Sequence, residues 1–364
     1  MKEKINIGLI FGGPSAEHEI SLISAKNIYQ AIDKELYNIY LIGVTRQGDW
    51  HFCPEPSFLP KKAGQDVPDI KDHGEPLLLK LGKSENNLFK ENGAPLKIDV
   101  FFPIIHGTCG EDGTLQGVLK LMCKPYVGPN TLGSAVGMDK DIMKRILIQA
   151  GIKTAKYTSV VKNDLGHIHY EEIIKQLGTT LFIKPSNSGS SIGVSRVETH
   201  EEFNNALNHA FEFDNKLIIE EGINGRELEC AVMGNDNPKA SQIGEITPTG
   251  HAFYSYESKY LDKKGAELKI PAELDEKTKN SIRKIAIDTF KILNCEGLAR
   301  VDVFLTKDQQ IYVNEINTLP GFTSISMYPS LWKASGIEYK NLITELIEYA
   351  IKRFNRDKKL KIIQ

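Results

Sequence analysis

The sequence predicts an α/β protein with more than one domain, built in part on a parallel β-sheet. The chain has 364 residues, enough for about two or three domains. Residues 5–11 form a short apolar run that ends in a Gly-Gly turn, and a second apolar run covers residues 39–44. These runs, at crossover distance, predict a strand–helix–strand unit with parallel strands. Between them, apolar residues recur at helical spacings of three and four: Ile20, Ile23, Ile28, Ala31 and Ile32.

The composition excludes several classes of protein. Lys and Arg total 45 and Asp and Glu total 47, so the net charge of −2 argues against a generally basic nucleic-acid binder. No apolar run approaches the length of a membrane helix, and the short N-terminal one leads into a loop rather than a cleavage site. Five scattered cysteines without a Cys-x-x-Cys pair favour reduced thiols. We therefore expect a cytoplasmic protein with neither nucleic acid nor a membrane as partner.

The later elements follow from the same signals. A first domain boundary is expected near residues 125–128, where the composition becomes loop-like. Thr199-His200-Glu201-Glu202 is a capping-box pattern, which predicts the start of a helix. The other expected elements are an insertion at 51–97 that is hairpin-like or irregular, a strand at 100–105, a helix at 139–150 ended by Gly151, a strand at 217–220, a helix at about 275–294, two strands, and a helix to about residue 354.

A glycine-rich and serine-rich loop follows the apolar run 181–183. Its sequence is Lys184-Pro185-Ser186-Asn187-Ser188-Gly189-Ser190-Ser191-Ile192-Gly193-Val194. Small residues let backbone N–H groups approach phosphates, and the lysine on the preceding strand adds a point charge. The loop is neither a Walker A loop nor a Rossmann fingerprint, because the required spacings are absent. Phosphate binding and a tight surface hairpin both remain open from the pattern alone.

Two acidic strands near the C-terminus indicate an oxygen-ligand site. Alternation places Arg300 and Asp302 on one face, and Glu315 and Asn317 on one face of the next strand. A hairpin turn centred between residues 308 and 309 sets Asp302 opposite Glu315 and Arg300 opposite Asn317. Opposed carboxylates repel, so a raised pKa, a basic partner or a cation must offset them. Two carboxylates and an amide suit Mg²⁺. The alternative is that these polar residues only face solvent.

Three further segments allow more than one interpretation. His106-Gly107-Thr108-Cys109-Gly110-Glu111-Asp112-Gly113 follows a strand end, where α/β ligand sites usually lie, although a lone histidine in a turn is more often structural. Glu17 lies just after the first Gly-Gly turn, where a carboxylate also complements a helix dipole. Residues 253–261 hold three tyrosines beside Lys259, which a polar loop with aromatic packing also explains.

Taken in order, these segments resemble the D-alanine–D-alanine ligases of the ATP-grasp superfamily. The resemblance runs from Gly12-Gly13-Pro14-Ser15-Ala16-Glu17 to about Trp332. Besides the histidine and glycine-rich motifs above, its most specific part is Asn314-Glu315-Ile316-Asn317-Thr318-Leu319-Pro320-Gly321-Phe322-Thr323. The resemblance implies three α/β domains: a substrate-binding domain over 1–127 with the insertion 51–97, a central ATP-grasp domain over 128–220, and a C-terminal domain over 221–364. ATP is then expected between the central and C-terminal domains.

The resemblance also implies the residues that bind the nucleotide and its metal. Lys140 and Lys184 match the lysines that contact ATP phosphates, and Glu227 matches the carboxylate on the ribose. Two Mg²⁺ ions, replaceable by Mn²⁺, are implied, and activation by a monovalent cation is compatible with the family. Asp302, Glu315 and Asn317 match the metal ligands. The remaining residues expected at the nucleotide are Ser191, Glu220, Ile223, Lys259 and Phe304.

For the amino acids, the resemblance implies a hydrogen-bonded triad of Glu17, Ser190 and Tyr260, with Glu17 also meeting the ammonium of the first D-alanine. Tyrosine at position 260 is typical of dipeptide-forming members. Arg300 and the Gly321 N–H match the groups that stabilise the tetrahedral oxyanion. His106, Ser326 and Met327 are expected at the substrate, with Ser326 on the carboxylate of the second D-alanine.

The activity implied is an ADP-forming carbon–nitrogen ligation. One D-alanine is phosphorylated by ATP to D-alanyl phosphate, and the amine of a second D-alanine displaces the phosphate to give D-alanyl-D-alanine for peptidoglycan synthesis. A homodimer is the assembly that the resemblance suggests. Three alternatives remain: a ligase that takes D-serine or D-lactate second, a biotin-dependent carboxylase, which the Glu17 segment argues against, and a non-catalytic nucleotide-binding module.

Overall fold

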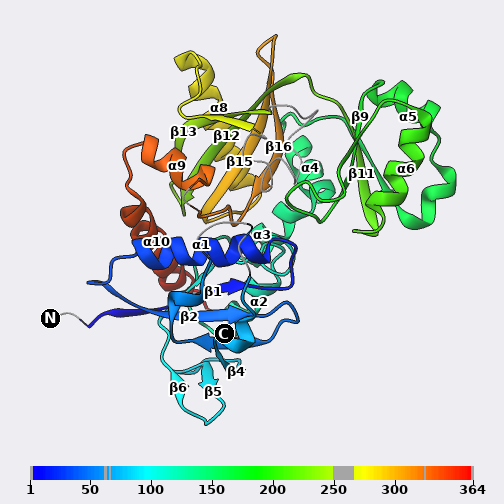
Figure 1. Ribbon diagram of the computed structural model, residues 1–364. Coiled ribbons are helices and arrows are strands. Elements are labelled where there is room, and N and C mark those ends of the chain that lie inside the picture. Colours follow the sequence, from blue (N-terminus) through cyan, green and yellow to red (C-terminus); the bar gives the residue numbers. More distant parts are fainter. Residues whose placement is uncertain (1–2, 61–63, 65–66, 249–265, 324, 362–364) are drawn as a thin grey trace.

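The computed structural model contains, over the residues that it describes, three β-sheets that follow one another along the chain (Figure 1). It describes residues 3–60, 64, 67–248, 266–323 and 325–361. Within those ranges, no helix combines the length and the apolar character needed to cross a membrane. Helices and strands are interspersed along the chain, and β1, α1 and β2 form a parallel unit, so the predicted α/β class is confirmed.

The first sheet holds the predicted strand–helix–strand unit. Its strand order is β6-β5-β4-β3-β2-β1-β7, and β1 pairs in parallel with both β2 and β7. The insertion at 51–97 is hairpin-like, one of the two expected forms, because it supplies consecutive antiparallel strands that extend the sheet at the lower end of Figure 1. The elements are β1 (Ile5–Gly12), α1 (His18–Ala31), β2 (Tyr37–Val44), β3 (Trp50–Cys53), η1 (Pro56–Phe58), η2 (Ile70–Asp72), β4 (Glu75–Leu79), β5 (Leu88–Lys90), β6 (Pro95–Leu96), β7 (Val100–Pro103), α2 (Thr114–Leu121) and α3 (Thr131–Met138).

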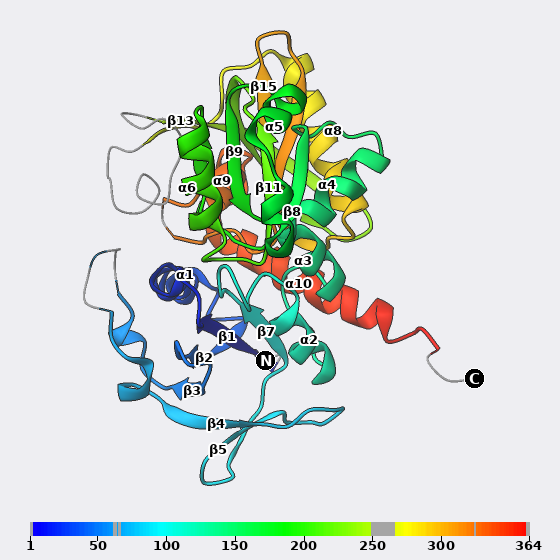
Figure 2. The same cartoon turned by 90° about the vertical axis from the view of Figure 1, so that its right-hand side faces the viewer.

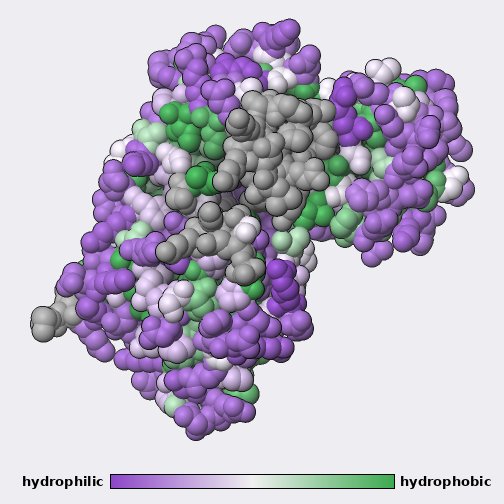
Figure 3. Space-filling model, viewed as in Figure 1, coloured by the Kyte–Doolittle hydropathy of each residue, from purple (hydrophilic) through white to green (hydrophobic). Residues whose placement is uncertain are grey.

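The second sheet is antiparallel, in the order β10-β9-β11-β8. The helix α6 packs on β9 and β10, and its predicted capping box is confirmed: the Thr199 hydroxyl accepts from the Glu202 N–H, and the Glu202 carboxylate accepts from the Thr199 N–H. Hydrophilic residues cover most of the visible surface of this lobe (Figure 3). The elements are α4 (Lys140–Gln149), β8 (Tyr157–Val161), η3 (Lys162–His167), α5 (Tyr170–Leu177), β9 (Leu181–Pro185), β10 (Ser195–Val197), α6 (His200–Ala210) and β11 (Lys216–Glu221).

The third sheet is also antiparallel, in the order β14-β13-β12-β15-β16. The helix α8 packs on β12, β13 and β15, and α9 packs on β12 and β13. Asp275 caps α8 by accepting a hydrogen bond from the Thr278 N–H. The elements are β12 (Gly225–Gly234), β13 (Lys239–Pro248), β14 (Ala266–Lys269), α8 (Glu276–Ile292), β15 (Gly297–Thr306), β16 (Ile311–Asn317), α9 (Met327–Ala334) and α10 (Tyr339–Asp357).

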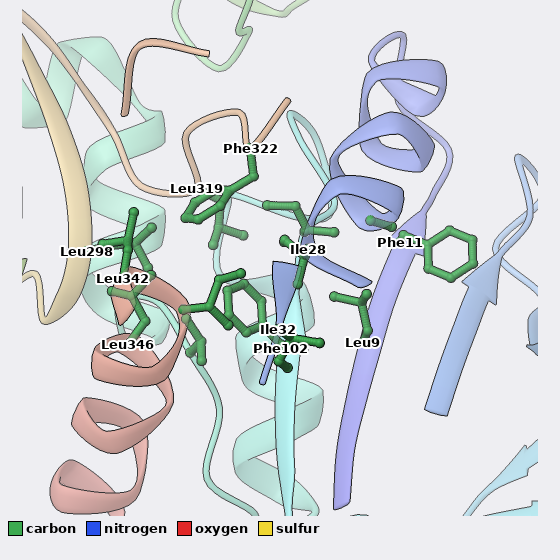
Figure 4. Close-up of a cluster of buried hydrophobic side chains, with 14 of the residues drawn as sticks. Leu9, Phe11, Ile28, Ile32, Phe102, Leu298, Leu319, Phe322, Leu342 and Leu346 are labelled. Atoms are coloured by element: carbon green, nitrogen blue, oxygen red, sulfur yellow. The ribbon is translucent and has the colours of Figure 1, made fainter. Parts of the chain in front are cut away.

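One hydrophobic core joins the first and third sheets through α10. Figure 4 shows Leu9 and Phe102 of the first sheet in the same buried cluster as Leu298 of β15 and Leu342 and Leu346 of α10. Figure 2 shows α10 running between the two sheets, and it contacts β7, β12 and β15. The two sheets are therefore held in a fixed relation by apolar burial.

The buried guanidinium of Arg353 connects α10 to the chain that leaves the first sheet. Its Nη1 donates to the Gly128 carbonyl at 2.5 Å, its Nη2 donates to the Tyr126 carbonyl at 2.8 Å, and the guanidinium lies 4.7 Å from the centre of the Tyr126 ring. Arg356, one turn later, forms ion pairs with Glu296 on a side chain that is 42% exposed.

We predict that Arg353→Met lowers the free energy of unfolding by about 2–4 kcal/mol, because two carbonyls lose a charged donor. Arg356→Met is the matched control and should cost less than about 1 kcal/mol, since exposed ion pairs contribute little. Denaturant unfolding of both variants measures the difference, and equal losses would contradict this role for Arg353.

Candidate active site

A cavity of about 390 Å³ lies between the second and third sheets. It is bounded by β9, β11, the loop after β9, and strands β12, β13, β15 and β16. The structure brings most of the residues predicted to contact the nucleotide to this one cavity. These are Lys140, Lys184, Ser191, Glu220, Ile223, Glu227 and Phe304. Lys259 and Tyr260 lie outside the described residues.

The Glu220 carboxylate, on β11, is buried between two ammonium groups. The Lys144 Nζ lies 2.6 Å from Glu220 Oε1, and the Lys184 Nζ lies 2.6 Å from Glu220 Oε2. Burial alone would raise the pKa of Glu220, but the two ammonium groups outweigh it and lower this pKa to about 2. Burial alone would lower the pKa of Lys184, but the Glu220 carboxylate outweighs this effect and raises it. Glu220 is therefore an ionised anchor for two cations.

Lys140 ties the start of α4 to the serine-rich loop. Asp139 caps α4 by accepting from the Ile142 N–H, which places Lys140 at the first helical position. The Lys140 Nζ donates to the Ser188 carbonyl at 2.6 Å and lies 3.6 Å from Glu315 Oε2. Because β9 and β10 are antiparallel, the loop does connect a hairpin, and it lines the cavity as well. The two interpretations of this loop are thus compatible.

The acidic hairpin has the predicted pairing at its functional end, although the predicted turn is wrong. Arg300 faces Asn317 and Asp302 faces Glu315. At the turn, however, Leu305 pairs with Ile311, so the turn is centred on residue 308. A one-residue shift between Asp302 and Val303 then restores the predicted pairs and leaves Asn314 without a counterpart on β15. The Lys184 Nζ donates to the Asn314 side chain at 3.4 Å.

Basic partners offset the repulsion between the opposed carboxylates. Arg300 donates through Nε and Nη2 to the two Asp302 oxygens, each at 2.7 Å, and its Nε lies 2.9 Å from Glu229 Oε2. Burial by itself would lower the pKa of Arg300, but Asp302 and Glu229 raise it well above its usual value. The Asn317 amide also donates to Asp302 at 3.2 Å.

The donor chemistry of this set fits magnesium. Asp302 and Glu315 supply hard carboxylate oxygens and Asn317 an amide oxygen, the ligands that Mg²⁺ prefers. Among the described residues, no group of three His, Cys, Asp or Glu side chains gathers as a metal cluster. A magnesium ion held by these residues would therefore have two carboxylate ligands from the protein, and a phosphate or water would supply its remaining ligands. Glu315 lines the cavity.

Glu17 joins the first sheet to the serine-rich loop. It precedes α1 but makes no side-chain capping bond, so helix capping does not explain its position. Instead, the Ser190 hydroxyl donates to the Glu17 carboxylate across two sheets. The backbone at Ser190 is left-handed, with φ of 51°, which turns the loop toward Glu17. Two members of the predicted triad thus make direct contact.

His106 is a buried connector in this structure. Its Nδ1 lies 2.9 Å from the Leu319 carbonyl and must donate, because a carbonyl only accepts. Its Nε2 then accepts from the Ser24 hydroxyl at 3.0 Å, and Ser24 in turn accepts from the Phe322 N–H at 3.2 Å. Burial lowers the pKa of His106. The histidine and Ser24 therefore hold the segment on both sides of Gly321.

The segment after Gly321 leads into α9. A Cβ added to Gly321 would lie 2.8 Å from Ser326 Oγ, so the chain folds back closely at this glycine. Ser326 Oγ accepts from the Thr323 N–H at 2.9 Å. Met327 is buried in the core that joins the first and third sheets, and its end packs beside Gly244.

Several residues of the site were not predicted from the sequence. Lys144 follows Lys140 by one helical turn, a spacing that places both ammonium groups on one face of α4. Glu229 pairs with Asp302 across β12 and β15, which became visible only with the strand order. Ser24 lies within the apolar face of α1, where nothing in the sequence sets it apart.

Glu111 is a further buried carboxyl beside His106. Its Oε1 accepts from the Gly107 N–H at 3.0 Å and lies 3.9 Å from His106 Nδ1. Burial, with the Glu17 charge as a second cause, raises the pKa of Glu111 to about 8. At neutral pH this carboxyl is therefore largely protonated.

Two family models match the chain, each over one part of it. A model described as the D-ala D-ala ligase N-terminus matches residues 6–129, and one described as the D-ala D-ala ligase C-terminus matches residues 146–348. The D-alanine–D-alanine ligase of Oceanobacillus iheyensis is 52% identical over 363 residues, which is 99% of this chain and 98% of that protein.

Solved structures resemble the whole chain. The D-alanine–D-alanine ligase from Coxiella burnetii superposes with a TM-score of 0.85 at 37% identity, covering 98% of each chain. The VanG D-Ala:D-Ser ligase from Enterococcus faecalis has the same TM-score at 35% identity, covering 96% of this chain and all of that one. A D-alanine–D-alanine ligase from Bacillus anthracis complexed with ATP has a TM-score of 0.73 at 29% identity, covering 97% and 99%.

We predict that Ser24→Ala lowers kcat, because the Phe322 N–H and His106 Nε2 lose their shared partner and the Gly321 segment is released. The loss of stability should be about 1–3 kcal/mol. Ser21→Ala is the matched control: Ser21 is equally buried on α1 and bonds to Gly12 and Ile104, away from that segment. It should lose similar stability while retaining kcat. Equal losses of kcat in steady-state assays of the two variants would contradict the prediction.

A second prediction concerns pH. Because the folded-state pKa of Glu111 exceeds its unfolded value, the folded protein binds the extra proton, and stability falls as pH rises from about 4.5 toward about 8. Glu111→Gln keeps an acceptor for Gly107 but removes the titration. Between about pH 5.5 and about pH 8, the free energy of unfolding should therefore fall by roughly 3 kcal/mol more in the parent than in the variant. Denaturant unfolding of both proteins at the two pH values measures the difference. The same change in the free energy of unfolding in both proteins would show that Glu111 does not titrate in this range.

Proposed function

The chain belongs to the D-alanine–D-alanine ligase family, and we propose from this premise that it joins two D-alanines through a D-alanyl phosphate formed with ATP. The ligase type and the ATP-grasp fold follow from the family, as the sequence predicted. The observation that supports the proposal most strongly is the 52% identity to a D-alanine–D-alanine ligase over nearly the full chain. The product is a dipeptide precursor of peptidoglycan.

ATP is assigned to the cavity between the second and third sheets. Lys140 and Lys184 present ammonium groups to the phosphates, with N–H groups of the loop that contains Ser191. Ile223 and Phe304 offer apolar surface to the base, and Glu227 offers a carboxylate to the ribose. The ATP complex of the Bacillus anthracis relative supports this nucleotide. Lys259 is proposed at the same nucleotide.

Magnesium is assigned to Asp302, Glu315 and Asn317, whose oxygen donors suit two Mg²⁺ ions, or Mn²⁺ in their place. Bound there, the metal neutralises negative charge on the phosphates. The protein adds two features of its own. Lys140 lies between Glu315 and the serine-rich loop, and Arg300 stays paired with Glu229 when Asp302 serves another cation.

The family resemblance assigns the chemistry to Arg300, the Gly321 segment and the Glu17–Ser190 contact. The carboxylate of the first D-alanine attacks the γ-phosphate of ATP, and ADP leaves. The amine of the second D-alanine attacks the resulting acyl carbonyl, phosphate leaves, and the amine nitrogen gives up a proton. Arg300 and the Gly321 N–H meet the negative charge that develops on the carbonyl oxygen. Glu17 offers a carboxylate to the first ammonium, and Ser326 a hydroxyl to the second carboxylate. Tyr260 is proposed to complete the triad with Glu17 and Ser190.

The setting of the enzyme is also proposed. All five cysteines are free thiols, which suits a reducing cytoplasm. The family resemblance supports a homodimer. The assignment of the second substrate has one serious competitor, because the VanG D-Ala:D-Ser ligase superposes as well as the Coxiella burnetii enzyme does. A D-serine-accepting ligase is therefore the second candidate.

The prediction is that ADP and phosphate appear only when ATP, Mg²⁺ and D-alanine are all present, with D-alanyl-D-alanine identified by mass.

Asp302→Asn should reduce the rate by about a hundredfold or more, because a charged ligand is lost. Adding D-serine or D-lactate in competition identifies the second substrate. D-Alanyl-D-serine in excess over the dipeptide would favour the second candidate, and D-alanyl-D-lactate in excess would contradict both assignments of the second substrate. ADP release that does not depend on D-alanine would contradict both.

A further inference from the structure

Lys144 is a charged side chain with no access to the cavity. It lies on α4 one turn after Lys140, and its side chain is 1% exposed. Its Nζ contacts Glu220 Oε1 at 2.6 Å and the Ala155 carbonyl at 3.5 Å, and it lies 5.5 Å from the centre of the Tyr157 ring. An ammonium buried so completely is unfavourable unless a specific partner balances it. Glu220 is that partner.

Glu220 has a second partner of a different kind. Lys184 contacts the other carboxylate oxygen at 2.6 Å, but its side chain is 14% exposed and lines the cavity. The two lysines thus share one carboxylate from opposite sides, one from the protein interior and one from the cavity wall. Lys184 also reaches the Asn314 side chain at 3.4 Å, which shows a second acceptor within its range.

Phosphate binding by Lys184 conflicts with its contact to Glu220. A phosphate and a carboxylate compete for the same ammonium, and withdrawing the only cation from a buried carboxylate is strongly unfavourable. We infer that Lys144 is a positioning residue for the nucleotide: it keeps Glu220 neutralised from the interior, so that Lys184 is free to turn toward the phosphates. This inference rests on the proposed assignment of ATP to the cavity.

The competing explanation is purely structural. In that case Lys144 only links α4 to β11, and its removal lowers stability without a specific effect on the nucleotide. The two explanations differ in how Lys144 and Glu220 are coupled. If Lys144 acts by neutralising Glu220, its removal matters for nucleotide binding only while Glu220 is charged.

The test is a double-mutant cycle on nucleotide affinity in the full chain. Binding of the non-hydrolysable analogue adenylyl imidodiphosphate with Mg²⁺ is measured by calorimetry for the parent, Lys144→Met, Glu220→Gln and the double variant. Lys144→Met should weaken binding by roughly tenfold in the parent, because Lys184 stays on Glu220, and by less than about twofold in the Glu220→Gln background. Lys144→Arg, which keeps the charge, should bind within about threefold of the parent.

Arg353→Met controls for general destabilisation, since it removes another buried cation far from the cavity. It should lower the thermal midpoint and leave the Kd of the analogue within about twofold. Lys144→Met that binds like the parent would overturn the inference. If Lys144→Met does not fold, the comparison of Glu220→Gln with the double variant decides. A roughly tenfold lower affinity of the double variant for the analogue would also overturn the inference, and equal affinities would agree with it. Failure of the parent itself to bind the analogue would instead contradict the nucleotide assignment.

Discussion

Charge balance around buried carboxylates is the constraint on which this site depends. An ionised carboxylate removed from water needs cations in direct contact, and a cation removed from water needs carboxylates. Glu220 meets this requirement with Lys144 and Lys184, and Arg300 meets it with Asp302 and Glu229. In the Glu220 group, Lys144 is enclosed by protein, whereas Lys184 lines the cavity. The net charge of −2 for the whole chain conceals these concentrated, opposed charges.

The same contacts connect the sheets. Lys144 on α4 and Lys184 on β9 meet on β11, while Lys184 also reaches Asn314 on β16. Glu17 reaches the serine-rich loop from the first sheet, and His106 with Ser24 holds the segment around Gly321. The apolar core around α10 holds the first and third sheets in place, so the polar contacts at the site form between sheets whose relative position is already fixed. Polar contacts at the cavity and the serine-rich loop also connect the second sheet to the others, through Lys184 with Asn314 and Ser190 with Glu17.

Sequence patterns predicted the local parts of this arrangement well. The strand–helix–strand unit, the capping box at Thr199 and the opposed pair Asp302–Glu315 all follow from periodicity and spacing over a few residues. The turn of the hairpin was misplaced because a one-residue shift in strand pairing leaves no signal in alternation. Lys144, Glu229 and Ser24 were missed because their partners lie on other strands and segments, and only the tertiary fold brings them together. The roles given to individual site residues remain predictions from the family resemblance.

The most direct test of this account is the position of the Lys184 ammonium in a crystal structure with bound nucleotide and Mg²⁺. We expect that Lys184 Nζ contacts a phosphate oxygen and has left Glu220 Oε2, while Lys144 Nζ remains on Glu220 Oε1. The contrary result is a bound nucleotide with Lys184 Nζ still 2.6 Å from Glu220 Oε2, the distance found without nucleotide. It would contradict the claim that Lys144 alone can neutralise Glu220 while Lys184 binds phosphate.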